Sequence, residues 1–275
     1  MSTVEISAAD VFKLRKQTGA GMMDCKKALA EANGDFEQAI DILRKQGQKL
    51  ANKRADREAS EGYAFGHTSN GKAYITVLNC ETDFVAKNES FGQLAQQFAK
   101  IAESNQVTTL EALLSSKFDD KITVSDKIIE QTGVIGEKLE ISHFSVIEGA
   151  SVYAYNHPGN QVVATIAFNK VVSEEIAKNV SMQIAAMAPV SISKDDCSAE
   201  IIEKELEIAR DITRQEGKPE EMVEKIAQGK LNKFFKESTL LSQDFIKDSK
   251  KTVQQYLQEQ DKELTVVAFK RFSMS

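Results

Sequence analysis

The amino-acid sequence predicts an α+β protein, and three observations lead to this fold class. Residues 1–52 combine the apolar spacing of short helices with glycine turns between them. A pattern of strand and turn signals recurs at an offset of 90 residues, which indicates two antiparallel sheets. Residues 199–236 contain two charged amphipathic stretches, which predict a helical hairpin of the coiled-coil type.

Length and composition exclude several classes of protein. The 275 residues allow two or three domains, and 41% hydrophobic with 28% charged residues is typical of a globular chain. No apolar run approaches the roughly 18 residues of a membrane span, and the N-terminus lacks the apolar core of a signal peptide. We therefore expect a cytoplasmic protein without a membrane partner.

The net charge and the small numbers of cysteines and histidines argue against a nucleic-acid partner and against a metal site. Residues 1–57 contain 11 Lys or Arg and 8 Asp or Glu, a net charge of +3, whereas the remaining residues carry −9. The overall charge of −6 disfavours direct binding of nucleic acid. The 3 cysteines and 3 histidines form neither a CxxC pair nor a clustered ligand set. We therefore expect neither a metal nor another cofactor.

The N-terminal module is expected to span residues 1–52. Ser7 predicts the N-cap of a first helix, and Gly34 and Asp35 predict the end of a second helix and the start of a third. The pattern resembles a ubiquitin-associated-type three-helix bundle, which binds partners without chemistry. Its predicted core contains Val11, Leu14, Cys25, Ala28, Leu29, Phe36, Ile40 and Leu43.

Met22 and Met23 stand at the start of the second predicted helix, where two interpretations are open. In one, a single methionine packs and the other is incidentally exposed. In the other, the pair forms an adaptable surface for a partner helix. Cys25 falls on the apolar face of the same helix, so we expect a core residue there rather than a nucleophile.

The rest of the chain contains an internal repeat. Residues 63–79 align with residues 153–169 through shared Tyr, Ala, His and Asn positions, and each copy predicts a β-hairpin. An amphipathic helix and a third strand follow each hairpin, and the third strands are expected at 138–147 and 263–272. In the second copy, the inward face of the helix is expected to consist of Ile176, Val180, Ile184 and Met187.

These patterns predict the domain boundaries. A charged linker at 53–62 should join the module to a first subdomain at 63–150 and a second at 151–275. Each subdomain is expected to pair one small antiparallel sheet with helices. The hairpin at 199–236 is inserted in the second subdomain, and it is either a solvated arm or a contact arm.

The connection that follows the second strand of the first copy contains Thr82, Asp83, Phe84 and Val85. Asn88 is expected to cap the next helix. From the residues alone two interpretations are open. Either Asp83 satisfies local N–H groups while Phe84 packs under the loop, or the loop contacts a partner.

Two long motifs resemble the elongation factor Ts family. They are TGAGMMDCKKAL, continued by EANGD, in the N-terminal module, and NCETDFVAK at 79–87. Similarity extends over essentially the whole chain, including IGE at 135–137 and GKP at 217–219. The resemblance implies a guanine-nucleotide exchange factor for elongation factor Tu in translation elongation, which makes and breaks no bonds and needs no catalytic residue.

The resemblance also implies roles for individual residues. The loop from Thr82 to Val85 would insert beside the partner's nucleotide site, where the ring of Phe84 acts as a wedge and disturbs the partner's Mg²⁺. His157 would contact the partner, whereas its copy His67 is expected to be structural. Further partner contacts are implied for Arg15, Met22, Met23, Lys26, Ile135 and Gly136.

The same family uses its helical hairpin for self-association in some members. This implies a possible homodimer, formed through the body of the protein or through the hairpin, whose tip contains Lys218 and Pro219. Two rival functions follow from the residues. One is a ubiquitin-type or ribosome-associated binding module without exchange activity. The other is a hydrolase or transferase built around Cys25 or Cys80.

Overall fold

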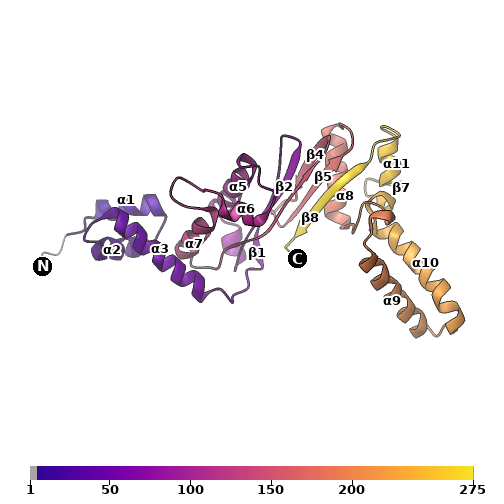
Figure 1. Ribbon diagram of the computed structural model, residues 1–275, viewed down its shortest axis with the longest axis horizontal. Helices are drawn as coiled ribbons and strands as arrows, with labels where there is room; N and C mark the ends of the chain where they lie inside the picture. Colours follow the sequence, from indigo (N-terminus) through magenta and orange to yellow (C-terminus); the bar gives the residue numbers. More distant parts are fainter. Residues whose placement is uncertain (1–4, 275) are drawn as a thin grey trace. The chain divides into compact units, whose positions relative to one another are not determined.

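A computed structural model describes residues 5–274 (Figure 1). By its contacts the chain divides into two units. Unit 1 contains the described residues of 1–65, 76–145 and 274–275, and unit 2 contains residues 66–75 and 146–273. The first four residues of the predicted module 1–52 and the last residue of the predicted subdomain 151–275 lie outside the described residues.

Helices dominate both units. The helices of unit 1 are α1 (Ala8–Thr18), α2 (Met22–Glu31), α3 (Phe36–Lys53), α4 (Asp83–Ala86), α5 (Glu89–Ser104), α6 (Leu110–Ser115) and α7 (Val124–Ile135). The helices of unit 2 are α8 (Glu174–Met187), η1 (Lys194–Asp196), α9 (Ala199–Gln215), α10 (Glu220–Ser238), η2 (Leu240–Ser242) and α11 (Val253–Gln258).

Two three-stranded sheets and one short two-stranded sheet accompany the helices. The strand orders are β1-β2-β3, β4-β5-β8 and β6-β7. The strands are β1 (Glu61–Ser69), β2 (Lys72–Cys80), β3 (Glu140–Glu148), β4 (Ser151–Asn156), β5 (Val162–Phe168), β6 (Asp244–Phe245), β7 (Asp248–Thr252) and β8 (Val266–Ser273). The described chain is therefore α+β, which confirms the predicted class.

The helix starts that the sequence predicts are confirmed by side-chain caps. The Ser7 hydroxyl accepts the Asp10 N–H at 3.1 Å, and the Asp35 carboxylate accepts the Gln38 N–H at 3.0 Å. Gly34 has a φ of 87°, the left-handed conformation expected where a helix ends. These signals are local, because each cap involves residues only three apart.

The three N-terminal helices bury a small core of their own. Its buried residues are Val11, Leu14, Ala20, Cys25, Ala28, Leu29, Ala32 and Ala39. Within unit 1, α3 also packs closely on α7 at Gly47 and Gly133. A Cβ added at Gly133 would lie 2.8 Å from the Gly47 Cα, so the two helix backbones meet without intervening side chains.

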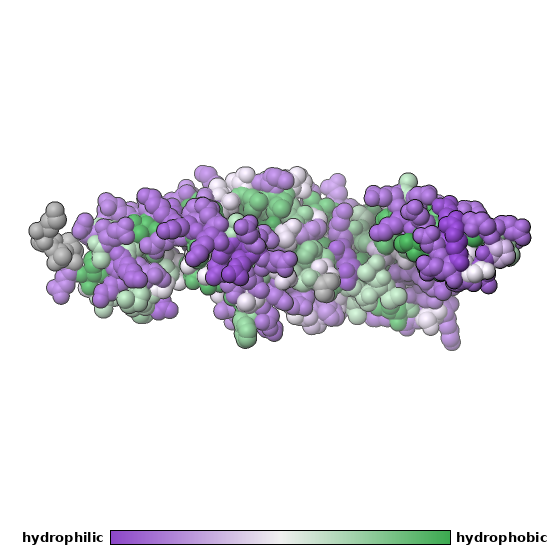
Figure 2. Space-filling model, turned by 90° about the horizontal axis from the view of Figure 1, so that it is seen from below, coloured by the Kyte–Doolittle hydropathy of each residue, from purple (hydrophilic) through white to green (hydrophobic). Residues whose placement is uncertain are grey.

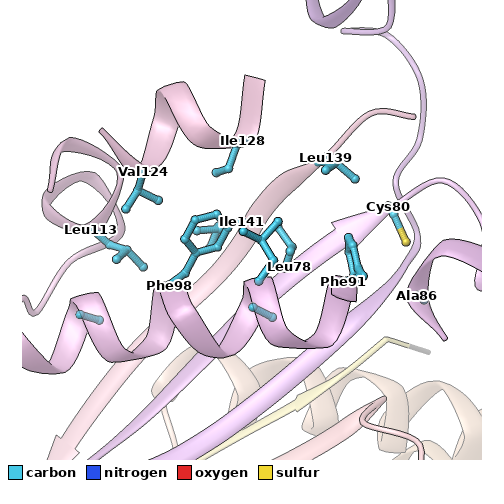
Figure 3. Packing of buried hydrophobic residues seen from close by; sticks show 13 residues of the cluster. Leu78, Cys80, Ala86, Phe91, Phe98, Leu113, Val124, Ile128, Leu139 and Ile141 are labelled. Carbon is cyan, nitrogen blue, oxygen red and sulfur yellow. The ribbon is translucent and has the colours of Figure 1, made fainter. Parts of the chain in front are cut away.

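The main core of unit 1 lies between the helices α5 and α7 and the strands β2 and β3 (Figure 3). Phe91 and Phe98 from α5 are almost completely buried in it. The ring of Phe118 meets that of Phe98 edge to face with centroids 5.9 Å apart. Truncating a phenylalanine in such a place costs about 3–5 kcal/mol. Cys80 and Ala86 complete the same cluster and connect it to α4.

Unit 2 contains the sheet β4-β5-β8, with α8 packed on β4 and β5. Tyr153 pairs with Ile166 across β4 and β5, and Thr165 pairs with Lys270 across β5 and β8. The prediction that Met187 faces inward is wrong, because this side chain is 47% exposed. The helix ends at Met187, and the next residue, Ala188, takes a left-handed φ of 44°.

The predicted helical hairpin is present as α9 and α10, joined at residues 216–219. Small buried residues, including Ala209 and Ala227, lie between its two helices. Arg210 forms an ion pair with Glu224 across the hairpin at 2.8 Å. Figure 2 shows mostly hydrophilic surface at the right-hand end of the view, where these helices lie. Such exposed ion pairs contribute little each, so the buried residues of both helices, which include Val223 and Leu231, hold the hairpin together.

The third strands shift slightly from their predicted ranges, to β3 and β8 as given above. Residues 54–60 connect α3 to β1, within the predicted linker 53–62. Asn70 and Gly71 join β1 to β2 with φ angles of 50° and 73°, the conformation that a two-residue hairpin turn requires. The predicted domain boundaries stay a prediction.

Candidate functional site

The segment between β2 and α5 presents an aromatic side chain to solvent. It was expected to be an irregular loop, but residues Asp83–Ala86 form the one-turn helix α4. Val85 and Ala86 pack against the core of unit 1, whereas Phe84 is 84% exposed. The interpretation in which Phe84 packs under the loop is therefore wrong. Val85 and Ala86 occupy the inward side of the turn, and the ring of Phe84 therefore faces solvent.

The carboxylate of Glu137 holds the chain that leads into α4. Its Oε2 atom accepts the backbone N–H groups of Glu81 and Thr82, each at 3.0 Å. Its Oε1 atom accepts the Thr82 hydroxyl at 2.6 Å. Hydrogen bonds to an ionised carboxylate are shorter and stronger than neutral ones. This carboxylate therefore fixes two consecutive residues just before Asp83.

A second carboxylate, that of Glu81, connects the same two segments in the opposite direction. It accepts the Lys138 N–H at 2.7 Å and the Arg54 guanidinium at 2.7 and 2.9 Å. The Lys138 N–H, and after it Arg54, lowers the pKa of Glu81. Glu81 and Glu137 thus form a reciprocal pair, in which each carboxylate binds the backbone of the other segment.

The thiols give no support to a cysteine nucleophile. Cys80 is fully buried and donates to the Thr82 carbonyl at 3.2 Å. Burial, and then the charge of Glu137, raises the pKa of the Cys80 thiol to about 12, which leaves almost no reactive thiolate at neutral pH. Cys25 is also fully buried, and burial raises its pKa, which confirms that it is a core residue.

Asp83 remains ionised beside the exposed ring. Its carboxylate pairs with the Lys87 ammonium at 2.6 Å, one helical turn away. This ion pair, and more weakly the local N–H groups of the backbone, lowers the pKa of Asp83. In one of the two interpretations above, Asp83 satisfies local backbone N–H groups. These groups contribute less to its environment than Lys87 does. The negative charge stands next to the apolar tip.

The N-terminal helices present a second exposed surface. Met22 is 38% exposed and Met23 is 63% exposed, while Arg15 and Lys26 also face solvent. Met22 is largely covered and Met23 is mostly exposed, so both interpretations of the methionine pair stay open. Phe12 is 62% exposed and stands one turn before Arg15. Sequence reasoning missed Phe12, although an aromatic residue directly after the inward Val11 signals an outward position.

Ile135 and Gly136 end α7 directly before Glu137. Ile135 packs on the core of unit 1, and Gly136 has a left-handed φ of 85° with open space around the position of a Cβ. The hydrogen bonds of Glu137 bring this end of α7 to Thr82. The structure thus connects two of the sites predicted from the sequence. Glu137 itself belongs to the IGE motif, but sequence reasoning gave it no role.

His157 lies in unit 2, in the turn between β4 and β5. It is exposed, and its Nδ1 atom lies 3.1 Å from the Tyr155 hydroxyl. His67, its copy in the repeat, is partly buried and stacks on Tyr74 with ring centroids 4.9 Å apart. The two histidines therefore differ in exposure, and their roles stay predictions.

Residues 5–274 contain no group of three or more His, Cys, Asp or Glu side chains placed to hold a metal ion. No helix within this range combines the length and the apolar character that a membrane span requires.

The described chain thus presents two exposed surfaces, an aromatic side chain on α4 and one face of the N-terminal helices. The sequence model of a family described as Elongation factor TS matches residues 81–275. The chain belongs to the elongation factor Ts family, which confirms the resemblance found in its motifs. Members of this family are guanine-nucleotide exchange factors for elongation factor Tu in translation elongation.

Relatives from several bacteria match the chain over nearly its whole length. A protein named elongation factor Ts from Christiangramia forsetii is 52% identical over 274 residues, which are 98% of this chain and 99% of that protein. The protein of the same name from Porphyromonas gingivalis is 47% identical over 270 residues, 98% of both chains. That from Bacteroides fragilis is 40% identical over 326 aligned positions, again with 98% of both chains covered.

Proposed function

We propose that this chain accelerates GDP release from elongation factor Tu by inserting the segment Thr82–Val85 beside the partner's nucleotide site. The 84% exposure of Phe84 on α4 carries the proposal. Burying such a side chain in a partner gains about 1.5–3 kcal/mol. The inward packing of Val85 and Ala86 supports a wedge that keeps its shape on contact.

In this mechanism the ring of Phe84 displaces side chains of the partner near its bound Mg²⁺. Mg²⁺ requires nearly octahedral oxygen coordination, so a small displacement of its surroundings weakens its hold. The ionised Asp83, which stands next to the ring, competes for polar groups of the partner. The nucleotide then dissociates faster, because its phosphates lose part of their counter-charge.

The exchange needs no bond-making chemistry. Because binding free energies are linked, the factor that weakens nucleotide binding is itself weakened by nucleotide to the same extent. The chain therefore acts as a nucleotide exchange factor and not as an enzyme with catalytic residues or a cofactor. It binds the nucleotide-free partner best.

The contact surface extends beyond the wedge. We propose further contact residues outside the wedge. The exposure of Met22 and Met23 and the open space at Gly136 support this. Soft methionine side chains suit a surface that must adapt to a partner helix. The full set of contact residues is Arg15, Met22, Met23, Lys26, Ile135, Gly136 and His157.

The finer architecture belongs to the same proposal. We interpret α1–α3 as a ubiquitin-associated-like module and the two three-stranded sheets as duplicated subdomains. The hairpin of α9 and α10 is then an inserted coiled-coil arm, and a homodimer forms through it or through the body of the protein. We place this chain in the cytoplasm, where elongation factor Tu is its partner and the chain itself contacts neither nucleic acid nor a membrane.

The release of a fluorescent GDP analogue from elongation factor Tu tests this function. The wild-type chain should strongly accelerate release into excess GDP. Phe84→Ala should lose most of the acceleration and remain folded, because the exposed ring contributes little to the core.

Each outcome of this assay has a distinct meaning. Acceleration that survives in Phe84→Ala would keep the function and move the mechanism to the other contacts. Binding to elongation factor Tu without any acceleration by the wild type would favour the rival binding module.

A further inference from the structure

We propose that Glu137 is a positioning residue, which holds Phe84 in its outward orientation before the partner arrives. The inference rests on the proposed function of Phe84. It goes beyond that function because it assigns the rigidity of the wedge to one carboxylate on a different segment of the chain. Glu137 follows α7 in the sequence, whereas Phe84 follows β2.

The four-residue helix α4 cannot hold its own shape. Isolated helices shorter than about 12–15 residues are marginal in water, because the first turn fixes several dihedral angles for a single hydrogen bond. In α4 the turn is closed by the Ala86 N–H to the Thr82 carbonyl at 3.2 Å and the Lys87 N–H to the Asp83 carbonyl at 3.0 Å. Contacts outside the helix must therefore fix it.

The C-terminal end of α4 is fixed by apolar packing. Val85 packs against the core of unit 1 and Ala86 is buried in it, near Cys80 and Phe91 (Figure 3). Phe84 receives no such support, because it is 84% exposed. The direction of its ring depends on the path of the backbone through Thr82 and Asp83. The N-terminal end of α4 thus needs an anchor of its own.

Glu137 provides this anchor with three hydrogen bonds. Both carboxylate oxygens are used, on the N–H groups of Glu81 and Thr82 and on the Thr82 hydroxyl. All three donors lie within the two residues before α4. Without these bonds the partner would have to order this backbone on contact, at a cost in conformational entropy. Pre-ordering therefore reduces the entropic cost of binding the partner.

The anchor is itself fixed from the other side. The Lys138 N–H donates to the Glu81 carboxylate at 2.7 Å. Glu81 therefore fixes the residue after Glu137, just as Glu137 fixes the backbone of Glu81. Glu137 also follows Gly136, whose left-handed φ of 85° turns the chain out of α7. The position of the carboxylate is therefore set by α7 and β3, and not by the loop alone.

Chymotrypsin can measure the rigidity of the wedge without any partner. Cleavage after Phe84 requires the local backbone to open, and cleavage after the exposed Phe12 in α1 provides an internal reference in the same digest. Glu137→Ala should be cleaved after Phe84 about tenfold faster than wild type, the factor that about 1.4 kcal/mol of lost local stability produces. Cleavage after Phe12 should stay unchanged.

Two further variants separate positioning from general destabilisation. Thr82→Val removes only the hydroxyl donor and should raise cleavage after Phe84 by a smaller factor. Glu140→Gln is the matched control on the same segment, because Glu140 forms an ion pair with the partly exposed Lys138 and is 43% exposed itself. Unchanged cleavage after Phe84 in both Glu137→Ala and Thr82→Val would overturn the proposal.

A double-mutant cycle in the GDP-release assay connects the anchor to Phe84. Glu137→Gln should slow exchange about tenfold in the wild-type background, and Glu137→Ala by at least as much, with Glu140→Gln neutral. In the Phe84→Ala background the same changes should have almost no effect, because the wedge is already absent.

Equal effects of Glu137→Gln in both backgrounds would contradict a positioning role. If the wild type does not accelerate release, the proposed function fails, while the chymotrypsin experiment still decides whether Glu137 holds Phe84.

Discussion

Two loops of the molecule invite comparison, because each follows the middle strand of a three-stranded sheet. The loop after β2 exposes Phe84 by 84%, and the loop after β5 exposes Val171 by 83%. Both loops are also tied to the segment that precedes the third strand of their sheet. Yet only the first contains a helix and an aromatic tip.

The ties differ in kind. In the first loop, partly buried carboxylates bind backbone N–H groups beside the tip. In the second, the Lys170 ammonium reaches Asp261 and Glu263, both at 2.9 Å and in exposed positions. The Asn169 amide adds two bonds to the backbone, one donated to the Glu263 carbonyl and one accepted from the Thr265 N–H. Exposed ion pairs contribute little to stability. Phe84 and Val171 are therefore equally exposed without being equally rigid.

The largest effect is expected when the exposed side chains of the two loops, Phe84 and Val171, are exchanged. Phe84→Val should slow GDP exchange by about 30-fold or more, corresponding to about 2 kcal/mol, because valine has no ring to fill the partner's pocket. Val171→Phe should leave exchange unchanged. The measurement is the release rate of the fluorescent GDP analogue. A variant carrying both changes that exchanged normally would show that the second loop can replace the first.

The amide of the second loop should matter for stability and not for exchange. Asn169→Ala removes both hydrogen bonds to the segment before β8 and should lower the free energy of unfolding by about 1–2 kcal/mol. Urea unfolding measures this change, and the exchange rate at a temperature where the variant is folded should match wild type. A loss of exchange activity in folded Asn169→Ala would assign a role to the second loop.

Acid should weaken the tie of the first loop. The pKa of Glu81 is lowered below its ordinary value of 4.5 in the folded chain, mainly by the Lys138 N–H. The contribution of the Glu81 carboxylate to stability is therefore complete above pH 4.5. It is lost as the pH falls through the lower pKa of the folded chain. Glu81→Gln should reduce stability at neutral pH by about 1 kcal/mol and flatten the acid limb of a stability curve.

The contrasting variant in the second loop is Asp261→Asn. Lys170 lowers the pKa of Asp261 as well, so stability is lost there in the same direction. Because that pair is exposed, we expect a smaller change in the acid limb than for Glu81→Gln. Equal changes in both variants would show that the two ties are equivalent.

The smallest effect is expected at the exposed pair next to the wedge. Lys87→Ala removes the partner of Asp83 and should leave the free energy of unfolding almost unchanged, because an exposed ion pair contributes little. The pKa of Asp83, followed by NMR, should rise toward its ordinary value when this partner is lost. A large loss of stability would mean that α4 depends on this pair and not on Glu137.

Local features could be predicted from the sequence, because their partners are close along the chain. The caps at Ser7, Asp35 and Asn88 each bind an N–H two or three residues away, and all three are confirmed. Apolar spacing also predicted the helices α5, α8, α9 and α10. Met187 was misplaced because periodicity does not show where a helix stops.

The supports of the candidate site could not be predicted in the same way. Glu137 lies 55 residues after Thr82, and nothing in the spacing of apolar residues brings the two together. The motifs identified Thr82–Val85 and Ile135–Gly136 as separate features of one family. Only the folded chain connects them through a carboxylate, and only it shows that the ring of Phe84 is exposed.

The buried thiols have a practical consequence. All 3 cysteines are buried, and the raised pKa values of Cys25 and Cys80 keep these two protonated at neutral pH. A single new cysteine at an exposed position such as Lys87 would therefore accept a maleimide dye selectively, with no native cysteine replaced. A fluorophore beside the wedge could then report in real time the moment at which this surface closes against another molecule.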